Sequence, residues 1–391
     1  MAGTIDGPRR RRALAAALVG ALAVPLLPGC SPRTLYRPLP ETAAGMWLPP
    51  ADQAIRNGGP EPPLLLAWLQ KPGRAPLGGP LMDGAVLLQV NGHSGVQVYD
   101  LASGEPVGRR SFSEDLCGPA ILAGEGAGLL VVTIAGAKGE VRAFDRQRRQ
   151  WRWRIPVKAC LSPALRGDTL VVAAASGLVL GLGATTGAEL WRWGGKRPFA
   201  APPALYDGGV VVGDAAGLVT ALGLGDGQVR WQRDLGTGVR GRPAIDGGAI
   251  LLTTAAAEVI CLDLASGEVR WRTAVGGRLS EGVAVGPAIL AVGSSDHGLY
   301  GLDLATGERR WRYDTGGTVR AAPACAGATV YAATGNGQLV AVAADSGQLR
   351  WQWELDAPVE APLALGPSVL AAATEAGTVY VFRAEGSHGV R

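Results

Sequence analysis

The chain is poor in the side chains that build most catalytic and metal centres. Its 391 residues include only three histidines and five cysteines. His93, His297 and His388 are far apart, and none stands at metal-ligand spacing from another histidine or a cysteine. There is no Ser/His/Asp arrangement of a known kind and no glycine-rich loop followed by a helix that could hold phosphate. The sequence therefore predicts no catalytic residue, no metal site and no cofactor.

Charge is also scarce, at 18% of residues, and the formal net charge of +4 is unevenly placed. Residues 1–29 contain Arg9, Arg10, Arg11 and Arg12 against one acid, Asp6, and so contribute +3. The rest of the chain carries only +1. A protein that binds nucleic acid through its folded domain usually shows a basic surface there. We therefore expect no nucleic-acid partner.

The chain does contain a ladder of tryptophans that recur at one constant interval. Its members are Trp151, Trp191, Trp231, Trp271, Trp311 and Trp351. Five of them close the phrase Gly-x-x-x-Trp, as in Gly187 to Trp191. A fixed period of about 40 residues indicates an array of one supersecondary unit.

One unit, from Trp191 to Trp231, shows what is repeated. It contains four short apolar segments, 203–205, 210–212, 218–222 and 228–231, separated by Gly/Asp turns and without a helical period. We name these strands A to D, with the tryptophan on D. Four-stranded units of about 40 residues that repeat radially are β-propeller blades. The predicted fold is all-β, with four-stranded antiparallel blades.

The two ends of the array complete each other. Trp68 precedes Pro80 by the same interval by which Trp191 precedes Pro203, so residues 64–69 form a D strand with no blade before it. Residues 378–382 form a C strand with no tryptophan strand after it. We expect the N-terminal strand to close the last blade and remove the open edges of the ring. Counting A strands, which lie near Pro80, Pro119, Pro163, Pro203, Pro243, Val283, Pro323 and Pro362, predicts an eight-bladed propeller over residues 64–383, with a short tail at 384–391.

The ladder is interpreted as a packing device. An indole on the outer strand can lie against the neighbouring blade and bury roughly 150–250 Å². The structural set comprises Trp68, Trp151, Trp191, Trp231, Trp271, Trp311 and Trp351. Blade one lacks the residue, because Gly108 stands in its place. Gly177, Gly217, Gly337 and Gly377 each follow a ladder tryptophan at the same offset and suit tight B–C turns, whereas Ala257 predicts a different turn.

The region before the first strand resembles an export and anchoring segment. Residues 1–29 have a basic start followed by an apolar stretch too short to span a bilayer, as in a signal peptide. The ending Leu27-Pro28-Gly29-Cys30 resembles a bacterial lipobox, which implies lipidation of Cys30; a plain secretory leader is the alternative. Residues 30–63 are rich in proline and predict an extended tether.

Two other groups of residues are candidates for a role. Cys117 and Cys160 precede the A strands of neighbouring blades and could form a disulfide if their Cα atoms lie within about 7 Å. Cys261 and Cys325 fall in strands and suit a buried core. The D–A loops, at one end of the propeller, carry cations that are candidates for partner binding: Lys158, Arg197, Arg240, Arg242, Arg278 and Arg320. A simple solvated loop surface is the alternative.

The phrase from Gly298 to Trp311 resembles the repeat of pyrroloquinoline-quinone (PQQ)-type propellers, and so do Gly337 to Trp351 and Ala257 to Trp271. Two branches of that family matter. Quinoprotein dehydrogenases hold quinone and Ca²⁺ at the axis beside a pair of adjacent cysteines, which this chain lacks. BamB-like lipoproteins are eight-bladed scaffolds of the outer-membrane β-barrel assembly machinery.

The chain's length, leader, tether and blade count are similar to the BamB-like branch. That resemblance implies a non-enzymatic lipoprotein of the outer membrane that faces the periplasm, anchored by lipid and bound to β-barrel assembly proteins, with no small-molecule substrate. A PQQ-dependent oxidoreductase or small-ligand-binding propeller, or a scaffold of another envelope complex, remains the alternative.

Overall fold

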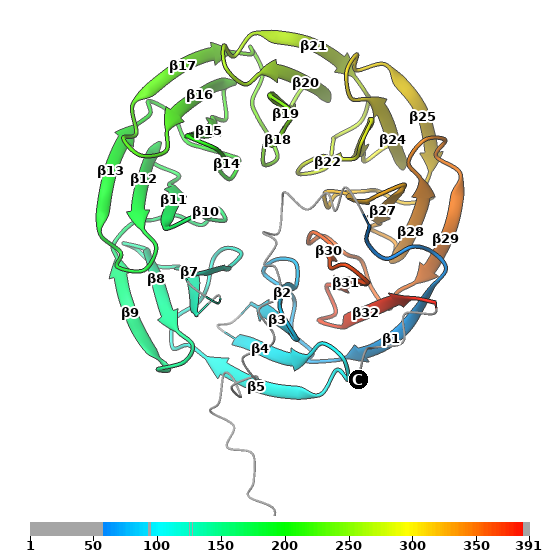
Figure 1. Ribbon diagram of the computed structural model, residues 1–391, viewed down its shortest axis with the longest axis horizontal. Helices are drawn as coiled ribbons and strands as arrows, with labels where there is room; N and C mark the ends of the chain where they lie inside the picture. The colour runs from blue at the N-terminus through cyan, green and yellow to red at the C-terminus, as the bar shows by residue number, and fades with distance from the viewer. Residues whose placement is uncertain (1–57, 93–94, 125, 127, 386–391) are drawn as a thin grey trace, which may run out of the picture. The chain divides into compact units, whose positions relative to one another are not determined.

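The computed structural model describes residues 58–92, 95–124, 126 and 128–385, and these form the propeller drawn in Figure 1. The predicted signal peptide, Cys30 and residues 31–57 of the tether lie outside the described residues. Within the described ranges the regular elements are all strands, and no helix there is long and apolar enough to cross a membrane. They form eight four-stranded antiparallel sheets, as predicted.

The first four blades follow the chain from the innermost strand outward (Figure 1). Blade one is β2 (Leu81–Asp83), β3 (Val86–Asn91), β4 (Gly95–Asp100) and β5 (Pro106–Ser111). Blade two is β6 (Ile121–Ala123), β7 (Leu129–Ile134), β8 (Glu140–Asp145) and β9 (Gln150–Ile155). Blade three is β10 (Ala164–Arg166), β11 (Thr169–Ala173), β12 (Leu178–Gly183) and β13 (Glu189–Gly194). Blade four is β14 (Ala204–Tyr206), β15 (Gly209–Gly213), β16 (Leu218–Gly223) and β17 (Val229–Asp234).

The remaining blades continue the ring and close it. Blade five is β18 (Ala244–Asp246), β19 (Ala249–Thr253), β20 (Glu258–Asp263) and β21 (Val269–Ala274). Blade six is β22 (Ala284–Val285), β23 (Ile289–Gly293), β24 (Gly298–Asp303) and β25 (Arg309–Asp314). Blade seven is β26 (Ala324–Ala326), β27 (Thr329–Ala333), β28 (Gln338–Ala343) and β29 (Leu349–Glu354). Blade eight is β30 (Ala364–Leu365), β31 (Val369–Ala373), β32 (Val379–Ala384) and β1 (Leu64–Gln70).

The closure by the N-terminal strand is confirmed. β1 pairs antiparallel with β32, with Leu64 opposite Ala384 and Gln70 opposite Val379 (Figure 1). The segment before β1 is also fastened, because the hydroxyl of buried Tyr331 donates to the carbonyl oxygen of Pro60 at 2.5 Å. The propeller's packing therefore begins a few residues before the predicted boundary at 64.

The tryptophans of the outer strands join neighbouring blades. The indole Nε1 of Trp311, for example, donates to the carbonyl oxygen of Ala344 in blade seven at 2.8 Å. Trp68, Trp191, Trp231 and Trp271 repeat this bond to the residue 33 positions later. Trp351 packs instead among Trp353 and Phe382, with ring centroids 6.2 and 5.3 Å away. Each of these tryptophans therefore contacts the following blade.

The glycine of the Gly-x-x-x-Trp phrase belongs to a different interface from its tryptophan. A Cβ on Gly347 would lie 2.7 Å from the ring of Trp311, which belongs to the preceding blade. Gly227 and Gly267 stand in the same relation to Trp191 and Trp231. These glycines also have positive φ, which is a second and independent reason for glycine at these positions. The glycine of each phrase therefore contacts the tryptophan of the preceding blade, and the tryptophan of the same phrase contacts the following blade.

In blade two the predicted ladder residue, Trp151, is wrong, because Trp153 occupies the ladder position. Opposite Ala143 on β8 stands Trp153, in the place that Trp231 occupies opposite Ala221. Trp153 is 8% exposed and donates to Ala184 in blade three at 2.8 Å. Trp151 instead packs with Phe112 and Phe144 against the core cluster shared by blades one and two. The constant period pointed to Trp151 because the D–A loop after Trp153 is shorter than its equivalents: Pro163 follows Trp153 by 10 residues, whereas Pro203 follows Trp191 by 12.

One further expectation was wrong. Ala257 was expected to change its B–C turn, but it keeps a positive φ of 59° and donates its N–H to Thr254, as Gly217 does to Asp214. His297 also adopts positive φ at the equivalent place. The strands on either side set the geometry of this turn, so Ala257 and His297 adopt a positive φ although it is strained for a residue with a side chain.

Candidate functional site

The inner strands surround a cavity of about 470 Å³ to which all eight blades contribute. Most of its lining is small or apolar, as at Gly79, Pro119, Leu161 and Ala200. Its charged residues come from one half of the ring: Arg240, Arg242, Asp246, Glu281 and Glu360, in blades five, six and eight. The cavity is therefore apolar on one side and carries charges of both signs on the other.

The six predicted partner-binding cations all lie on the D–A loops, but they are not equivalent. Lys158, Arg197, Arg240 and Arg278 are exposed, and within the described residues their side chains make no hydrogen bond or ion pair. Arg242 is half-buried, lines the cavity and donates to the carbonyl oxygen of Pro163 in blade three at 3.3 Å. Arg320 pairs with Glu360 of blade eight. Four of the six cations are thus available at this end, and two hold neighbouring parts of the ring.

An acidic pair that the sequence analysis did not single out stands beside Arg320. Burial and the neighbouring Glu360 carboxylate raise the pKa of Glu375, whereas Arg320 acts in the opposite direction. The two carboxylates are separated along the chain and come together only because a D–A loop and a B–C turn of blade eight share one end of the sheet. A salt bridge this exposed contributes little to stability. Arg320, Glu360 and Glu375 instead place charges of both signs close together at the end of the propeller that carries the D–A loops, which we call the loop end.

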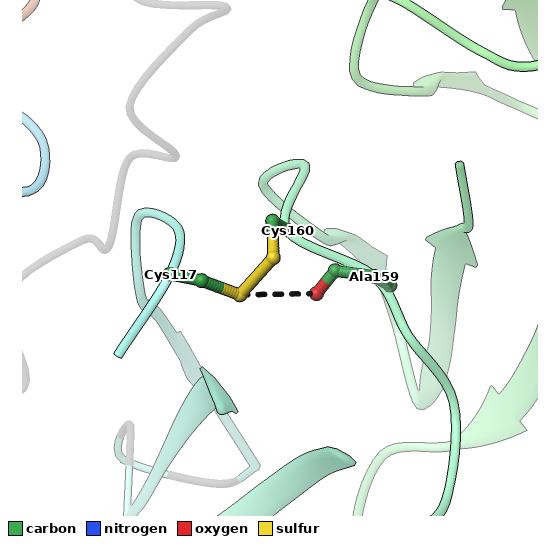
Figure 2. The surroundings of a disulfide bond; sticks show 3 residues. All are labelled: Cys117, Ala159 and Cys160. Carbon is green, nitrogen blue, oxygen red and sulfur yellow. Dashed lines mark hydrogen bonds between the residues drawn. A yellow bond between two sulfur atoms is a disulfide. The ribbon is translucent and has the colours of Figure 1, made fainter. Parts of the chain in front are cut away.

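The disulfide that the sequence analysis considered possible is present in the structure. Cys117 and Cys160 are bonded, with their Cα atoms 5.1 Å apart, and join the loops that enter blades two and three (Figure 2). Sγ of Cys117 also lies 3.8 Å from the carbonyl oxygen of Ala159; this is a contact, since a disulfide sulfur has no proton to donate. Cys160 lines the central cavity. The bond therefore fixes part of the apolar side of the cavity mouth.

The other two described cysteines are core residues, as predicted. Cys261 faces Trp271 across the strands, and Cys325 is 2% exposed. Burial raises the pKa of Cys261 and raises that of Cys325 to about 11, so both favour the unreactive thiol. Among the described residues, no group of three or more His, Cys, Asp or Glu side chains is placed to hold a metal ion.

Comparison with known proteins gives a family and a set of similar folds. The family model described as outer membrane protein assembly factor BamB matches residues 66–191, 137–222 and 215–389. No curated protein sequence gives a significant match. The crystal structure of BamB from Moraxella catarrhalis is 18% identical, with a TM-score of 0.69 over 82% of this chain and 99% of that one.

Other similar structures belong to proteins with different descriptions. A quinohemoprotein alcohol dehydrogenase from Pseudomonas putida is 12% identical, with a TM-score of 0.68 over 86% of this chain and 79% of its own. Sqt1 from Saccharomyces cerevisiae is 12% identical, with a TM-score of 0.68 over 84% of this chain and 99% of its own. At such identities a structural match shows the fold alone. The family match, by contrast, spans the whole propeller, and this chain belongs to the family of outer membrane protein assembly factor BamB.

Proposed function

We propose that this chain is a non-enzymatic scaffold of the machinery that assembles β-barrel proteins in the outer membrane, held there by a lipid on Cys30 and facing the periplasm. The observation that carries the proposal is the family match over residues 66–389, which covers every blade. The lipobox-like ending at Cys30 and the proline-rich tether support the anchor.

The loop end is the surface we assign to the partner. Lys158, Arg197, Arg240 and Arg278 are exposed there without partners in the described part of the chain, on loops held in place by rigid blades. Arginine is favoured at protein interfaces because its planar guanidinium makes several hydrogen bonds at once. A partner with carboxylates facing these loops would be recognised without any rearrangement of the fold.

Co-purification from detergent-solubilised membranes tests the partner. We expect the wild-type protein to retain a β-barrel assembly component and the variant Arg197→Ala/Arg240→Ala/Arg278→Ala to lose it with an unchanged melting temperature. The control Arg233→Ala/Arg309→Ala/Arg350→Ala removes the same charge from outer strands and should leave capture unchanged. Equal capture by all three proteins would contradict the loop-end assignment.

The anchor is tested separately. Cys30→Ser should move the protein from membranes to the soluble exported fraction, and mass spectrometry of the wild type should show acyl chains. A variant that stays in the membrane with its leader uncleaved, together with a wild type free of lipid, would contradict the anchor and leave the partner assignment standing.

A second candidate, ligand binding at the axis, is favoured by the central cavity and its charged half. The residues present do not fit the quinone site implied by the dehydrogenase resemblance. The chain has no adjacent cysteines, and Cys160 at the cavity is bonded to Cys117 of the neighbouring blade. Visible absorbance after addition of PQQ and Ca²⁺ distinguishes the candidates: a bound chromophore would favour the axial site, and an unchanged spectrum the scaffold.

A further inference from the structure

The outer strand of blade two departs from the repeat in its charges. Because Trp153 occupies the position of Trp231 and Trp271, the register of the blades can be compared residue by residue. Arg152 on β9 then corresponds to Arg270 on β21, and Arg154 corresponds to Arg272. The same side chains thus stand at the same places on two outer strands, and their surroundings can be compared directly.

In blade five both arginines are neutralised within their own sheet. Arg270 pairs with Asp263 at 2.6 Å, and Arg272 pairs with Glu258 at 3.3 Å. Blade six repeats the first pair, between Arg310 and Asp303 at 2.7 Å. In blade five the two acids stand at the two ends of the C strand, β20, and each of them neutralises one of the arginines.

In blade two the equivalent acids are already engaged. Asp145, at the place of Asp263, pairs with Arg148 at 3.0 Å. Glu140, at the place of Glu258, pairs with Arg142 at 2.6 Å. Both of these arginines are additions that blade five lacks.

Arg152 and Arg154 are therefore left without a counter-charge. They are exposed and make no hydrogen bond or ion pair with any residue that the structure describes. Arg154 even stands opposite Arg142 across the strands, a like-charge pairing that disfavours the sheet.

The neighbouring turn adds a third exposed cation. Arg149 has a positive φ of 59° at the place where other blades carry the glycine beneath an indole. Blade one has Gly108 instead of that tryptophan, so a side chain at Arg149 meets no ring. A non-glycine residue at such a φ is strained, and strain of this kind concentrates at functional places.

These cations flank an unpaired backbone edge. β9 is the last strand of its sheet, with β8 on one side and no described strand on the other. Arg152 and Arg154 are both exposed on β9, on either side of buried Trp153. The strand bulges at Arg152, since Trp153 faces Ala143 and Trp151 faces Phe144 on β8. An open edge offers backbone N–H and C=O groups to an added strand, while the side chains next to it set the specificity.

We propose that the edge of β9 binds an extended acidic segment of a partner protein, with two carboxylates in an acid-x-acid pattern lying opposite Arg152 and Arg154. Opposite charges facing each other across neighbouring strands stabilise the pairing. A peptide uses both the backbone edge and the guanidinium groups, whereas a lipid headgroup uses only the charges. The edge therefore selects alternate acidic side chains in an extended conformation.

The test is titration of the purified full-length protein with a short peptide of alternating glutamate and threonine, followed by fluorescence anisotropy. We expect saturable binding, weakened about tenfold in Arg152→Gln/Arg154→Gln, because two exposed ion pairs together contribute roughly that factor. The matched control Arg270→Gln/Arg272→Gln removes the same charge from blade five and should change the affinity less than about twofold. N-methylation of the peptide backbone should abolish binding.

Several results would overturn the proposal. Equal weakening in both double variants would show unspecific attraction to a cationic surface. Undiminished binding of the N-methylated peptide would exclude strand addition. Binding of the wild type to phosphatidylglycerol vesicles but not to the peptide would assign the surface to lipid headgroups. Melting temperatures of the two variants equal to that of the wild type confirm that folding is not the cause.

Discussion

A glycine-to-alanine pair tests whether each Gly-x-x-x-Trp phrase receives the indole of the preceding blade. Gly347 and Gly316 have nearly the same backbone conformation, with φ of 68° and 66°. A Cβ on Gly347 would lie 2.7 Å from the ring of Trp311, whereas a Cβ on Gly316 would meet nothing within 4 Å. Alanine would therefore cost the same backbone strain at both positions, but only at position 347 would its methyl group clash with a side chain.

The magnitudes follow from that difference. Alanine in the left-handed region costs about 1–2 kcal/mol, and the lower entropy of the unfolded alanine chain returns about 0.4–1 kcal/mol. Gly316→Ala should therefore destabilise by about 0.5–1.5 kcal/mol. Forcing a methyl group against the buried indole should add about 1–3 kcal/mol, so Gly347→Ala should cost about 2–4 kcal/mol.

The assay is urea unfolding followed by circular dichroism, with Trp311→Ala as a second background. Once the indole is removed, the cost of Gly347→Ala should fall to that of Gly316→Ala, giving a coupling energy of about 1–3 kcal/mol between positions 311 and 347. If the two glycine variants cost the same, or if the cost at Gly347 persists without Trp311, the interpretation of the repeat is wrong.

The other predictions concern the corrected ladder, the ring closure, the disulfide and acid stability. Trp153→Ala should cost about 3–5 kcal/mol, like Trp311→Ala, and more than Trp151→Ala, whose ring is only half-buried; the reverse order in thermal melting would contradict the register of blade two. Deleting residues 64–70 should cause aggregation by leaving blade eight with an open edge, and a monomeric variant in size-exclusion chromatography would refute the closure. Cys117→Ser/Cys160→Ser should lower the unfolding free energy by about 2–4 kcal/mol, and an unchanged denaturation midpoint would argue against the bond. Hydrogen bonds from Arg270 and Arg310 lower the pKa of Asp263 and of Asp303 from 3.8 to about 2, so the stability that these ion pairs give is present above about pH 4 and is lost as the pH falls towards 2. The variant Asp263→Asn/Asp303→Asn should therefore lose less melting temperature than the wild type between pH 4 and pH 2. An equally steep decline in both proteins would contradict this assignment.

The architecture could be predicted from the amino-acid sequence alone. The constant period of the tryptophans, the four apolar segments per unit and the unmatched strands at residues 64–69 and 378–382 were enough to predict eight blades closed by β1. These features are visible because every blade repeats the same local pattern, so an error in one unit is corrected by the others. The burial of Cys261 and Cys325 followed from the same alignment of repeats.

The differences between blades depend on contacts that form only in three dimensions. The choice between Trp151 and Trp153 depended on the pairing of β9 with β8, which places Trp153 opposite Ala143. The bond between Cys117 and Cys160 depended on how closely two loops approach. Whether an arginine is neutralised or available, as for Arg270 against Arg152, depended on which acids other side chains had already engaged. A repeat fixes the positions of residues along the strands, but competition among partners in space decides which of them remain free to bind.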